Sequence, residues 1–536
     1  MYDAIIVGAG PAGGVSALRL AQAGFRVLCL EQGDWQDPQS FPSAQREIEV
    51  LATKDWNPNP NVRQHPEDYP VDTSDSDMDT AMFNGVGGGT VLFGGSWHRA
   101  LPEDFEVRTR DGVADDWPLG YQELAPFYDR TFKMFGVSGL SGDPRYPDRF
   151  DYATPPLPAG SVGVLGAQGM KKLGWHFWPA SNAIASRPTE WLSACVGWGT
   201  CGQGCPEGAK GAADVAVWKA AIQTGAELRT RCRARAVTLD SSGRARGVVY
   251  LDAQGVEHEV TASVVIVAAN AIGTARLLQL SATAEHPDGL GNSSGLLGRN
   301  LMMHPYIAVN GIFDDWTEAW TGPWGNRLYS LEFYGTSEER DFVRGAKWSL
   351  NPAGGPLFSL SSYDYDQIGA NAEAWGPTHH DYVQKRVGHM MSWDIIAEDL
   401  PEETNRVILD DSRNDAYGIP GARIEYKISE NTRRMIDFNV ARATEAMQAS
   451  GATEVAPHFS RAGGWHLYGT TKMGTDPATS VTDQWGETHD VDNLFLLGAS
   501  TFVTSFGVNP TATIAALALR TAEYIISNRS NTAKAI

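Results

Sequence analysis

The residues best suited to chemistry in this chain of 536 residues lie near its end. His466 stands in the segment Trp-His-Leu-Tyr-Gly-Thr, and Asn509 follows 43 positions later in Gly-Val-Asn-Pro-Thr. A histidine titrates near neutral pH and can take the proton of a hydroxyl group, while an asparagine carboxamide can hold the same oxygen by a hydrogen bond. The chain has twelve histidines, and most of them should be surface or hydrogen-bonded core residues. The pair therefore matters only if it faces a ligand site.

A glycine turn at the start of the chain predicts such a site. An apolar strand over residues 4–7 runs into Gly8-Ala9-Gly10-Pro11-Ala12-Gly13. The first glycine permits a tight turn, the second lets the backbone approach a pyrophosphate, and the third lets strand and helix pack closely. The helix predicted over residues 11–23 then directs its free N–H groups and its dipole at the phosphates.

The strand that follows completes the dinucleotide signature. Residues 26–30 read as a strand, and Glu31 stands at its carboxyl end, 23 positions after Gly8. An acid at this place can accept hydrogen bonds from an adenosine ribose. A Gly-rich turn without a ligand would not require this context, so the unit predicts a dinucleotide cofactor.

Residues 84–95 favour FAD over NAD as that cofactor. This segment contains six glycines, which let the backbone lie flush against a large planar ligand. A mobile surface loop is the alternative, but Val91, Leu92 and Phe93 make a solvated loop less natural.

Length and composition limit the class of protein. A chain of this length should form about two lobes, and 42% hydrophobic and 20% charged residues are ordinary for a globular protein. The net charge of −21 argues against nucleic acid and anionic membranes as partners, and no apolar run is long enough to span a membrane. Because Met1 lies directly before the first strand, with no room for a signal peptide, we expect a cytoplasmic protein.

The five cysteines are too few and of the wrong number for a disulfide framework. Three of them, Cys195-x5-Cys201-x3-Cys205, invite an iron–sulfur or zinc interpretation. Their spacing fits neither the paired C-x2-C of zinc sites nor the common cluster runs, so we expect no metal. Elemental analysis for iron and zinc decides between these interpretations.

The expected fold class is α/β with two lobes. A Rossmann-like FAD-binding lobe is discontinuous, over residues 1–300 and 456–536, and a substrate-binding lobe over residues 301–455 is inserted into it on a mostly antiparallel sheet. Residues 34–80 are irregular and rich in proline, and they predict a long loop that is either a lid or an oligomer arm. The inserted lobe carries scattered tryptophans at positions 316, 320, 324, 348, 375 and 393. They could pack on sugar rings, although core packing explains most of them.

Taken together, these segments resemble the glucose–methanol–choline (GMC) flavin oxidoreductases. The resemblance covers most of the cofactor lobe and little of the middle of the chain. It is carried by residues 7–33, 84–105, 116–119, 205–210, 267–274, 298–305 and 465–525. His304, in Met-Met-His-Pro, resembles a family segment at the lobe junction and is interpreted as structural. His379 and His380 lie in a polar stretch that could line a substrate entrance, although a solvated loop is the simpler explanation.

The resemblance implies which residues act. In that family a histidine in an H-x-x-G-T segment and a histidine or asparagine some forty residues later form the catalytic pair, and His466 and Asn509 occupy those positions. The resemblance also implies contacts of the flavin with the C-terminal block, and backbone contact of the adenine with Ala236 or Val237. The residues expected to contact FAD are Gly8, Gly10, Pro11, Ala12, Gly13, Glu31, Gln32, Gly88, Gly89, Thr90, Gly94, Gly95, Ser96, Ala236, Val237, Ala269, Gly498, Ala499, Asn509, Pro510 and Thr511.

The asparagine and the phrase Gly507-Val508-Asn509-Pro510-Thr511 resemble the pyranose oxidase branch and the bacterial glycoside 3-oxidases. The chain departs from family patterns at Thr471-Lys472-Met473-Gly474 and at Gly498-Ala499-Ser500. Some pyranose oxidases attach FAD covalently through the histidine of a Ser-Thr-His-Trp segment. Here Gly95-Ser96-Trp97-His98 shifts the histidine by one position, so we expect noncovalent FAD.

The sequence therefore predicts FAD-dependent oxidation of a secondary hydroxyl of a pyranose sugar or glycoside to a keto sugar. His466 accepts the proton, Asn509 orients the oxygen, flavin N5 takes the hydride, and O2 becomes hydrogen peroxide. One alternative is a dehydrogenase with a quinone or protein acceptor, or an oxidase of aromatic or aliphatic primary alcohols. A flavin-fold protein kept for binding or structure is a third possibility, and a homo-oligomer is compatible with all three.

Overall fold

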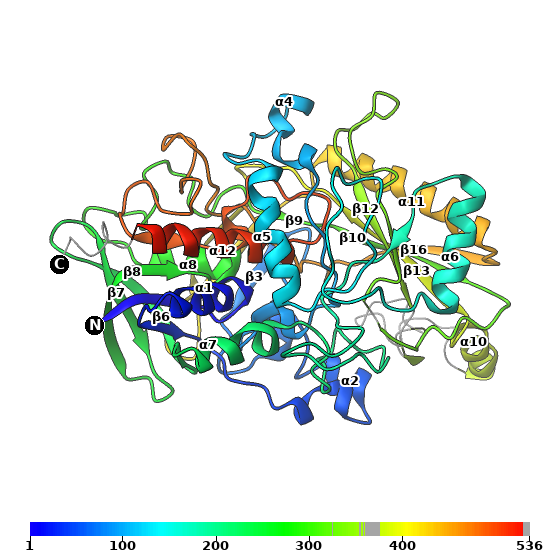
Figure 1. Cartoon of the computed structure of the whole chain (residues 1–536), viewed down its shortest axis with the longest axis horizontal. Coiled ribbons are helices and arrows are strands. Elements are labelled where there is room, and N and C mark those ends of the chain that lie inside the picture. The colour runs from blue at the N-terminus through cyan, green and yellow to red at the C-terminus, as the bar shows by residue number, and fades with distance from the viewer. Residues whose placement is uncertain (324, 353–354, 357–358, 360–375, 529–536) are drawn as a thin grey trace.

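The computed structural model describes residues 1–323, 325–352, 355–356, 359 and 376–528. Two large sheets organise the chain, one on each side of Figure 1. The first has the order β5-β2-β1-β8-β7-β6, and β18 also pairs with β8. Its strands are β1 (Tyr2–Val7), β2 (Val27–Leu30), β5 (Glu227–Arg229), β6 (Arg233–Leu239), β7 (Ala245–Leu251), β8 (Glu257–Val267) and β18 (Leu494–Leu496).

Strand β8 joins the parallel and antiparallel halves of this sheet. Its last residues run parallel to β1, with Val267 opposite Val7, and parallel to β18, while its first residues pair antiparallel with β7. Residues 264–267 are fully buried. A strand buried on both faces in this way reads as a continuous apolar run. The predicted parallel strands of a Rossmann-like fold are thus present.

The last helix of the chain packs against the first. Helix α12 (Thr511–Ser527) lies beside α1 (Pro11–Gln22), and their apolar residues share one core with α5 (Tyr121–Met134). The chain around the first sheet also contains the helices α4 (Val107–Asp111), α7 (Lys219–Gln223) and α8 (Asn270–Leu280). Its shorter turns are the π-helical η5 (Asp214–Trp218) and the 3-10 turns η3 (Gly88–Val91), η4 (Pro102–Phe105) and η9 (Ala499–Thr501).

The second sheet is antiparallel, in the order β16-β10-β13-β12-β11-β4. One face is covered by α6 (Gly160–Leu173) and α11 (Glu430–Ser450), and Trp348 and Trp393 are buried in this core. Its strands are β4 (Trp178–Pro179), β10 (Tyr306–Ile312), β11 (Leu328–Ser330), β12 (Ala346–Pro352), β13 (Met390–Ala397) and β16 (Glu454–Phe459). Helix α6 and strand β4 precede residue 301, so the core of this part recruits chain from outside the predicted insert.

Residues 34–80 contain more regular structure than their composition suggested. Prolines at the first position of a helix cost no hydrogen bond, and Pro38, Pro42 and Pro60 each begin a short helix here. The elements are η1 (Pro38–Ser40), η2 (Pro42–Ala44), α2 (Ile48–Ala52), α3 (Pro60–Arg63) and β3 (Val71–Ser76). Strand β3 runs parallel to β15 (Pro420–Tyr426), which pairs with β14 (Arg406–Asn414). The remaining elements are β9 (Met302–Met303), paired with β17 (Leu467–Tyr468), and η8 (Gly376–Thr378) followed by α10 (His379–Arg386).

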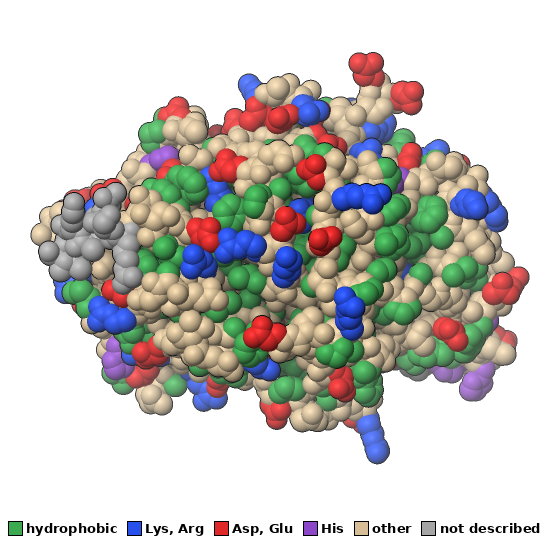
Figure 2. All heavy atoms as spheres, in the orientation of Figure 1, with side chains coloured by type: hydrophobic (Ala, Val, Ile, Leu, Met, Phe, Trp, Pro, Cys, Tyr) green, Lys and Arg blue, Asp and Glu red, His purple; other side chains and the backbone are tan. Residues whose placement is uncertain are grey.

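The molecular surface carries charges of both signs. Figure 2 shows acidic and basic side chains interspersed with apolar ones over the face in view. Among the described residues, no helix combines the length and the apolar composition that crossing a membrane requires.

A buried ion cluster connects the part of the chain that carries the parallel sheet (the first part) with the part that carries the antiparallel sheet (the second part). Arg344, just before β12, contacts Asp104 and Asp111 from the first part and Glu398 from the second. Arg344, Asp104 and Glu398 are almost completely buried. Burial raises the pKa of Asp104 to about 6 and that of Glu398 to about 7, although the guanidinium opposes this shift. Arg344 therefore stabilises two carboxylates that would otherwise be costly to bury.

Substituting Arg344→Met should lower the free energy of unfolding by about 3–5 kcal/mol, because two buried carboxylates lose their cation. A carboxyl with a raised folded-state pKa destabilises the fold above that pKa, and the cost is relieved as the pH falls through it. The loss should therefore be smaller at pH 5 than at pH 8, as measured by thermal or urea unfolding. Arg406→Met, which removes a half-exposed pair with Glu425, is the control and should cost about 1 kcal/mol or less. An equal loss for both variants would contradict the role of the cluster.

Candidate active site

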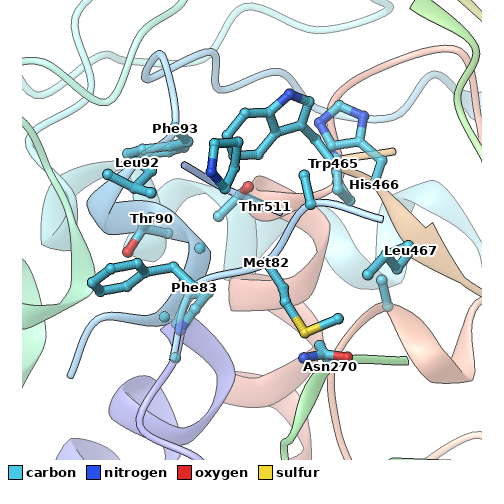
Figure 3. Close-up of a pocket in the computed structure, with 18 of the residues that line it drawn as sticks. Met82, Phe83, Thr90, Leu92, Phe93, Asn270, Trp465, His466, Leu467 and Thr511 are labelled. Carbon is cyan, nitrogen blue, oxygen red and sulfur yellow. The ribbon is translucent and has the colours of Figure 1, made fainter. Parts of the chain in front are cut away.

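A cavity of about 510 Å³ runs between the two large sheets. It begins at the carboxyl ends of the parallel strands, at Gly8 and Glu31, and reaches the polar face of the antiparallel sheet at Tyr306 and Asp394. Its size is typical of cofactor and substrate sites. Figure 3 shows Trp465 and His466 on one side of this cavity, with Thr90, Leu92 and Phe93 on the other side.

The glycine turn has the geometry that its spacing predicted. Gly8 has a φ of +103°, and a Cβ at Gly13 would lie 2.0 Å from the Gly8 carbonyl oxygen, so neither position tolerates a side chain. A Cβ at Gly10 meets no atom within 4 Å and would lie in open space at the cavity wall. The turn is therefore closed toward the protein and open toward a ligand at Gly10.

Glu31 is a fixed acceptor at the same end. Its carboxylate oxygens accept hydrogen bonds from the backbone N–H groups of Ala9, at 2.8 Å, and Gly33, at 2.9 Å. Burial raises the pKa of Glu31, and these backbone hydrogen bonds oppose the shift. Glu31 lines the cavity, so its remaining acceptor capacity faces the place predicted for a ribose.

Most of the residues predicted to contact FAD lie in the cavity wall. They are Gly8, Gly10, Pro11, Ala12, Glu31, Gln32, Gly88, Gly89, Thr90, Gly94, Ser96, Ala269, Gly498, Ala499, Asn509, Pro510 and Thr511. The other four, Gly13, Gly95, Ala236 and Val237, are not part of this wall. Gly13 packs on Gly8, and Gly95 backs onto Ile184. In strand β6 a register shift between Ala234 and Ala236 interrupts the alternation of side chains.

The bulge in β6 lies beside the residues predicted to meet the adenine. Among the described residues, Ala234 in this strand and Cys232, directly before it, line the cavity, whereas Ala236 and Val237 do not. The Val237 N–H donates to Ser281 Oγ at 2.9 Å instead.

The Gly-rich segment 84–95 is held from behind. The buried Lys210 donates from Nζ to the carbonyl oxygens of Val91, at 2.8 Å, and Phe93, at 3.0 Å, and also to that of Cys201. The cysteine loop thus supports the wall of the cavity. All five cysteines are free of disulfides, and no group of three His, Cys, Asp or Glu in the described part of the chain is arranged to hold a metal ion.

The tertiary structure brings His466 and Asn509 together. Strand β17 pairs with β9, which places His466 beside His304, and Asn509 directly precedes helix α12. The distance from His466 Nε2 to Asn509 Nδ2 is 3.4 Å, and the distance from His466 Nε2 to the Tyr306 hydroxyl is 3.3 Å. All three residues line the cavity, so a ligand oxygen can reach the donors and the imidazole.

A chain of hydrogen bonds fixes the tautomer of His466. His304 Nε2 lies 2.6 Å from the carbonyl oxygen of Phe506, which only accepts, so Nε2 carries the proton. Burial lowers the pKa of His304 to about 3, so its Nδ1 is a bare acceptor. His466 Nδ1 lies 2.9 Å from that nitrogen and must donate to it. The proton of neutral His466 therefore sits on Nδ1, and the lone pair of Nε2 faces the cavity.

The basic form of His466 is also favoured by its surroundings. Burial lowers the pKa of His466 well below the ordinary value, and nearby His304 and Lys347 lower it further. The imidazole is consequently neutral at neutral pH. It can accept a proton at Nε2 without first losing one.

Lys347 orients Asn509. Its amine, fully buried on β12, donates to Asn509 Oδ1 at 2.5 Å and to Ser96 Oγ at 3.0 Å. Ser96 Oγ donates to the same Oδ1 at 2.8 Å. Because Oδ1 is engaged on that side, the N–H groups of Asn509 face His466 and Tyr306. Asn509 is thus a donor to any oxygen placed at the cavity wall.

Sequence reasoning missed several of these groups. His304 was interpreted as structural only, and Lys347, Tyr306 and Asp394 were not singled out. A lone lysine among apolar strand residues is a signal for a buried function, but only the sheet register shows what it faces.

Other predicted candidates lie elsewhere. His379 and His380 begin helix α10 outside the cavity wall, and Trp316 and Trp320 are partly exposed. Trp324 and Trp375 lie outside the described residues. Trp56 and Trp465 are the tryptophans that line the cavity within the described chain.

Comparison with known proteins identifies the class. The family models for the N- and C-terminal parts of GMC oxidoreductases match residues 2–306 and 401–518. The chain is 39% identical to a 2-methyl-1,2-propanediol dehydrogenase of Mycolicibacterium austroafricanum, over 98% of this chain and 95% of the relative. It is 31% identical to a 6'''-hydroxyparomomycin C oxidase of Streptomyces lividus, over 98% and 91%. Pyridoxine 4-oxidase from Mesorbium loti has the same fold, with a TM-score of 0.62 at 19% identity over 97% and 98% of the two chains.

The chain belongs to the GMC oxidoreductases, which act on the CH–OH groups of alcohols and sugars, and its cofactor is FAD. The structure fits that cofactor. The turn is open at Gly10, Glu31 offers an acceptor at one end, and the cavity continues without interruption to the His466–Asn509 pair. Its branch within the family stays a prediction.

Substituting Gly10→Val should remove FAD without unfolding the chain, because the new side chain enters open cavity space rather than the protein interior. We expect flavin content per chain to fall by about tenfold or more, with an unchanged far-ultraviolet circular dichroism spectrum. Gly120→Ala is the matched control, since a Cβ there also meets no atom within 4 Å but lies at the exposed start of α5. Normal flavin content in Gly10→Val would show that the pyrophosphate does not pass over this turn.

Proposed function

We propose that this chain oxidises a secondary hydroxyl of a pyranose sugar or glycoside to the keto sugar, with O2 as electron acceptor and hydrogen peroxide as product. The observation that carries the proposal is the bare Nε2 of neutral His466, held beside the donor face of Asn509 at the cavity wall. FAD, when bound, supplies the oxidant that takes the hydride from the carbinol carbon. The hydroxyl proton passes to His466 Nε2.

The geometry around His466 supports this division of roles. The contacts of Nε2 with Tyr306 and Asn509 are long, at 3.3 and 3.4 Å. Catalytic hydrogen bonds often tighten only when substrate is present. A substrate oxygen between these groups would accept from the Asn509 N–H and donate its proton to Nε2. Donation to that oxygen favours the negative charge that develops as the proton leaves.

A second candidate function is supported by the 39% identical relative, which is a diol dehydrogenase. In that case the same pair removes the proton from a smaller diol, and the electrons leave to a quinone or a protein rather than to O2. The 31% identical relative is an oxidase, so the relatives include both a dehydrogenase and an oxidase.

We further propose that FAD is held noncovalently. The buried His98 packs edge-on against the ring of Tyr329, outside the cavity wall formed by the described residues. Ser96, not a histidine, occupies the wall at this turn.

Part of segment 34–80 also lines the cavity, through Ala52, Trp56, Asn57, Pro58, Asn59 and Val62, which supports a lid rather than an oligomer arm there. The free state of all five cysteines supports a reducing, cytoplasmic compartment.

Substituting His466→Ala should slow anaerobic flavin reduction by roughly a hundredfold or more, because the proton loses its acceptor. Flavin content should stay normal. In the wild type, the lowered pKa of His466 keeps the base form populated, so the rate should hold its value as the pH falls below 6.5. His258→Ala, in the exposed hairpin of β7 and β8, is the control. Near-normal reduction of His466→Ala by stopped-flow absorbance would remove this residue from the role of base.

A substrate and acceptor panel tests the reaction itself. We expect pyranoses and glycosides to bleach the flavin anaerobically faster than benzylic or short aliphatic alcohols, and O2 to restore the colour with one hydrogen peroxide per turnover. Faster bleaching by small diols, together with reoxidation by a quinone but not by O2, would favour the dehydrogenase. Flavin that no alcohol or sugar bleaches would overturn both.

A further inference from the structure

Three cross-strand rows of the antiparallel sheet contribute residues to the cavity wall, namely Tyr306, Ile396, Ala308, Asp394, Ser349 and Asn351. Nearest the catalytic pair, Ile396 lies between Tyr306 and Lys347. Two residues further along each strand, Asp394 lies between Ala308 and Ser349, and after another two, Ser392 lies between Asn310 and Asn351. Alternate residues of a strand share one face, and two residues advance about 7 Å. The second row therefore lies about 7 Å from the first along the strands.

The second and third rows hold buried polar atoms that lack a protein partner. Among the described residues, neither Ser349 Oγ nor Asn351 Oδ1 has a hydrogen-bond partner. These side chains are 2% and 6% exposed, and both residues line the cavity. Buried polar groups are normally hydrogen-bonded, so these two indicate a ligand that supplies the partner.

Asp394 adds acceptors to the same place. One of its carboxylate oxygens accepts from Ser392 Oγ at 2.6 Å and the other from Asn351 Nδ2. Each oxygen can accept a further hydrogen bond, and Asp394 lines the cavity. Opposite it in the same row, Ala308 is small and leaves room above the sheet.

From these observations we infer a second subsite on the sheet, formed by Ser349, Asn351 and Asp394, that binds hydroxyl groups of the substrate. The inference rests on the proposed function, because it concerns the same substrate. Acceptors dominate the subsite, so it takes O–H donors. The 7 Å spacing suits a polyhydroxylated ring, whose far hydroxyls reach the second row while one hydroxyl meets His466. A monohydric alcohol or a vicinal diol is too short to use both places.

Ser349→Ala is the cleanest test, because Ser349 Oγ bonds no described protein group and its removal should leave the fold unchanged. Asp394→Asn keeps the shape of the side chain and exchanges one acceptor oxygen for a donor. Each holoenzyme is compared with wild type using D-glucose and methyl α-D-glucopyranoside, against cyclohexanol and 1,2-propanediol as substrates that lack the far hydroxyls. The matched control is Ser242→Ala, in the exposed turn between β6 and β7.

For the pyranoses, we expect both subsite variants to raise the substrate concentration needed for half-maximal flavin reduction by about tenfold. The maximal rate should be nearly unchanged. For cyclohexanol and 1,2-propanediol, the half-maximal concentration and the maximal rate should both stay unchanged. An equal effect on all four compounds, or none on the pyranoses, would overturn the subsite. Tighter binding of D-glucosamine than of D-glucose that is lost in Asp394→Asn would show an ammonium site and overturn the hydroxyl assignment.

Equilibrium binding separates this inference from the proposed function. Perturbation of the oxidised flavin spectrum by D-glucose reports binding without turnover. If wild type binds the sugar, Ser349→Ala binds it about tenfold more weakly and neither reduces the flavin, the subsite stands while the proposed oxidation fails. If wild type shows no pyranose binding at all, the subsite falls as well.

Discussion

The hydrogen bond between His304 Nε2 and the carbonyl oxygen of Phe506 determines which nitrogen of His466 is basic. A carbonyl can only accept, so it sets the tautomer of His304, and His304 sets that of His466. Phe506 has a φ of +58°, which is uncommon for a residue with a side chain. Its ring is clamped by Phe105 and Trp117. The packing thus maintains a backbone conformation that turns the carbonyl toward the histidine.

The same short segment positions the second member of the pair. Asn509 follows Phe506 by three residues, and its Oδ1 is held by Ser96 from the first part and Lys347 from the second. Burial lowers the pKa of Lys347 well below its ordinary value, and the nearby Asp394 opposes this shift. The proton acceptor and the hydrogen-bond donor that we propose are therefore both held in place by hydrogen bonds within the protein, as electrostatic preorganisation requires.

Much of the cofactor lobe could be predicted from the sequence, because its signals are local. Gly8, Gly10 and Gly13 perform three different mechanical tasks within six residues, and a glycine pattern records all three. The strand over residues 264–267 is apolar at every position because it is buried on both faces. The adenine contact of Ala236 or Val237 stays a prediction, and the β-bulge beside these residues does not show in the pattern of residue types.

By itself, then, the sequence determined the dinucleotide turn and the flavin class and predicted the pair His466 and Asn509, since each depends on neighbours in the chain or on a family motif. The tertiary structure alone decided what surrounds that pair. His304, Lys347, Ser349 and Asp394 lie far from it in sequence and meet it only through the pairing of β9 with β17 and the register of β10, β12 and β13. A shift of one residue in that register would turn every one of these strand side chains to the opposite face, and no local pattern of residues specifies such an alignment between distant strands.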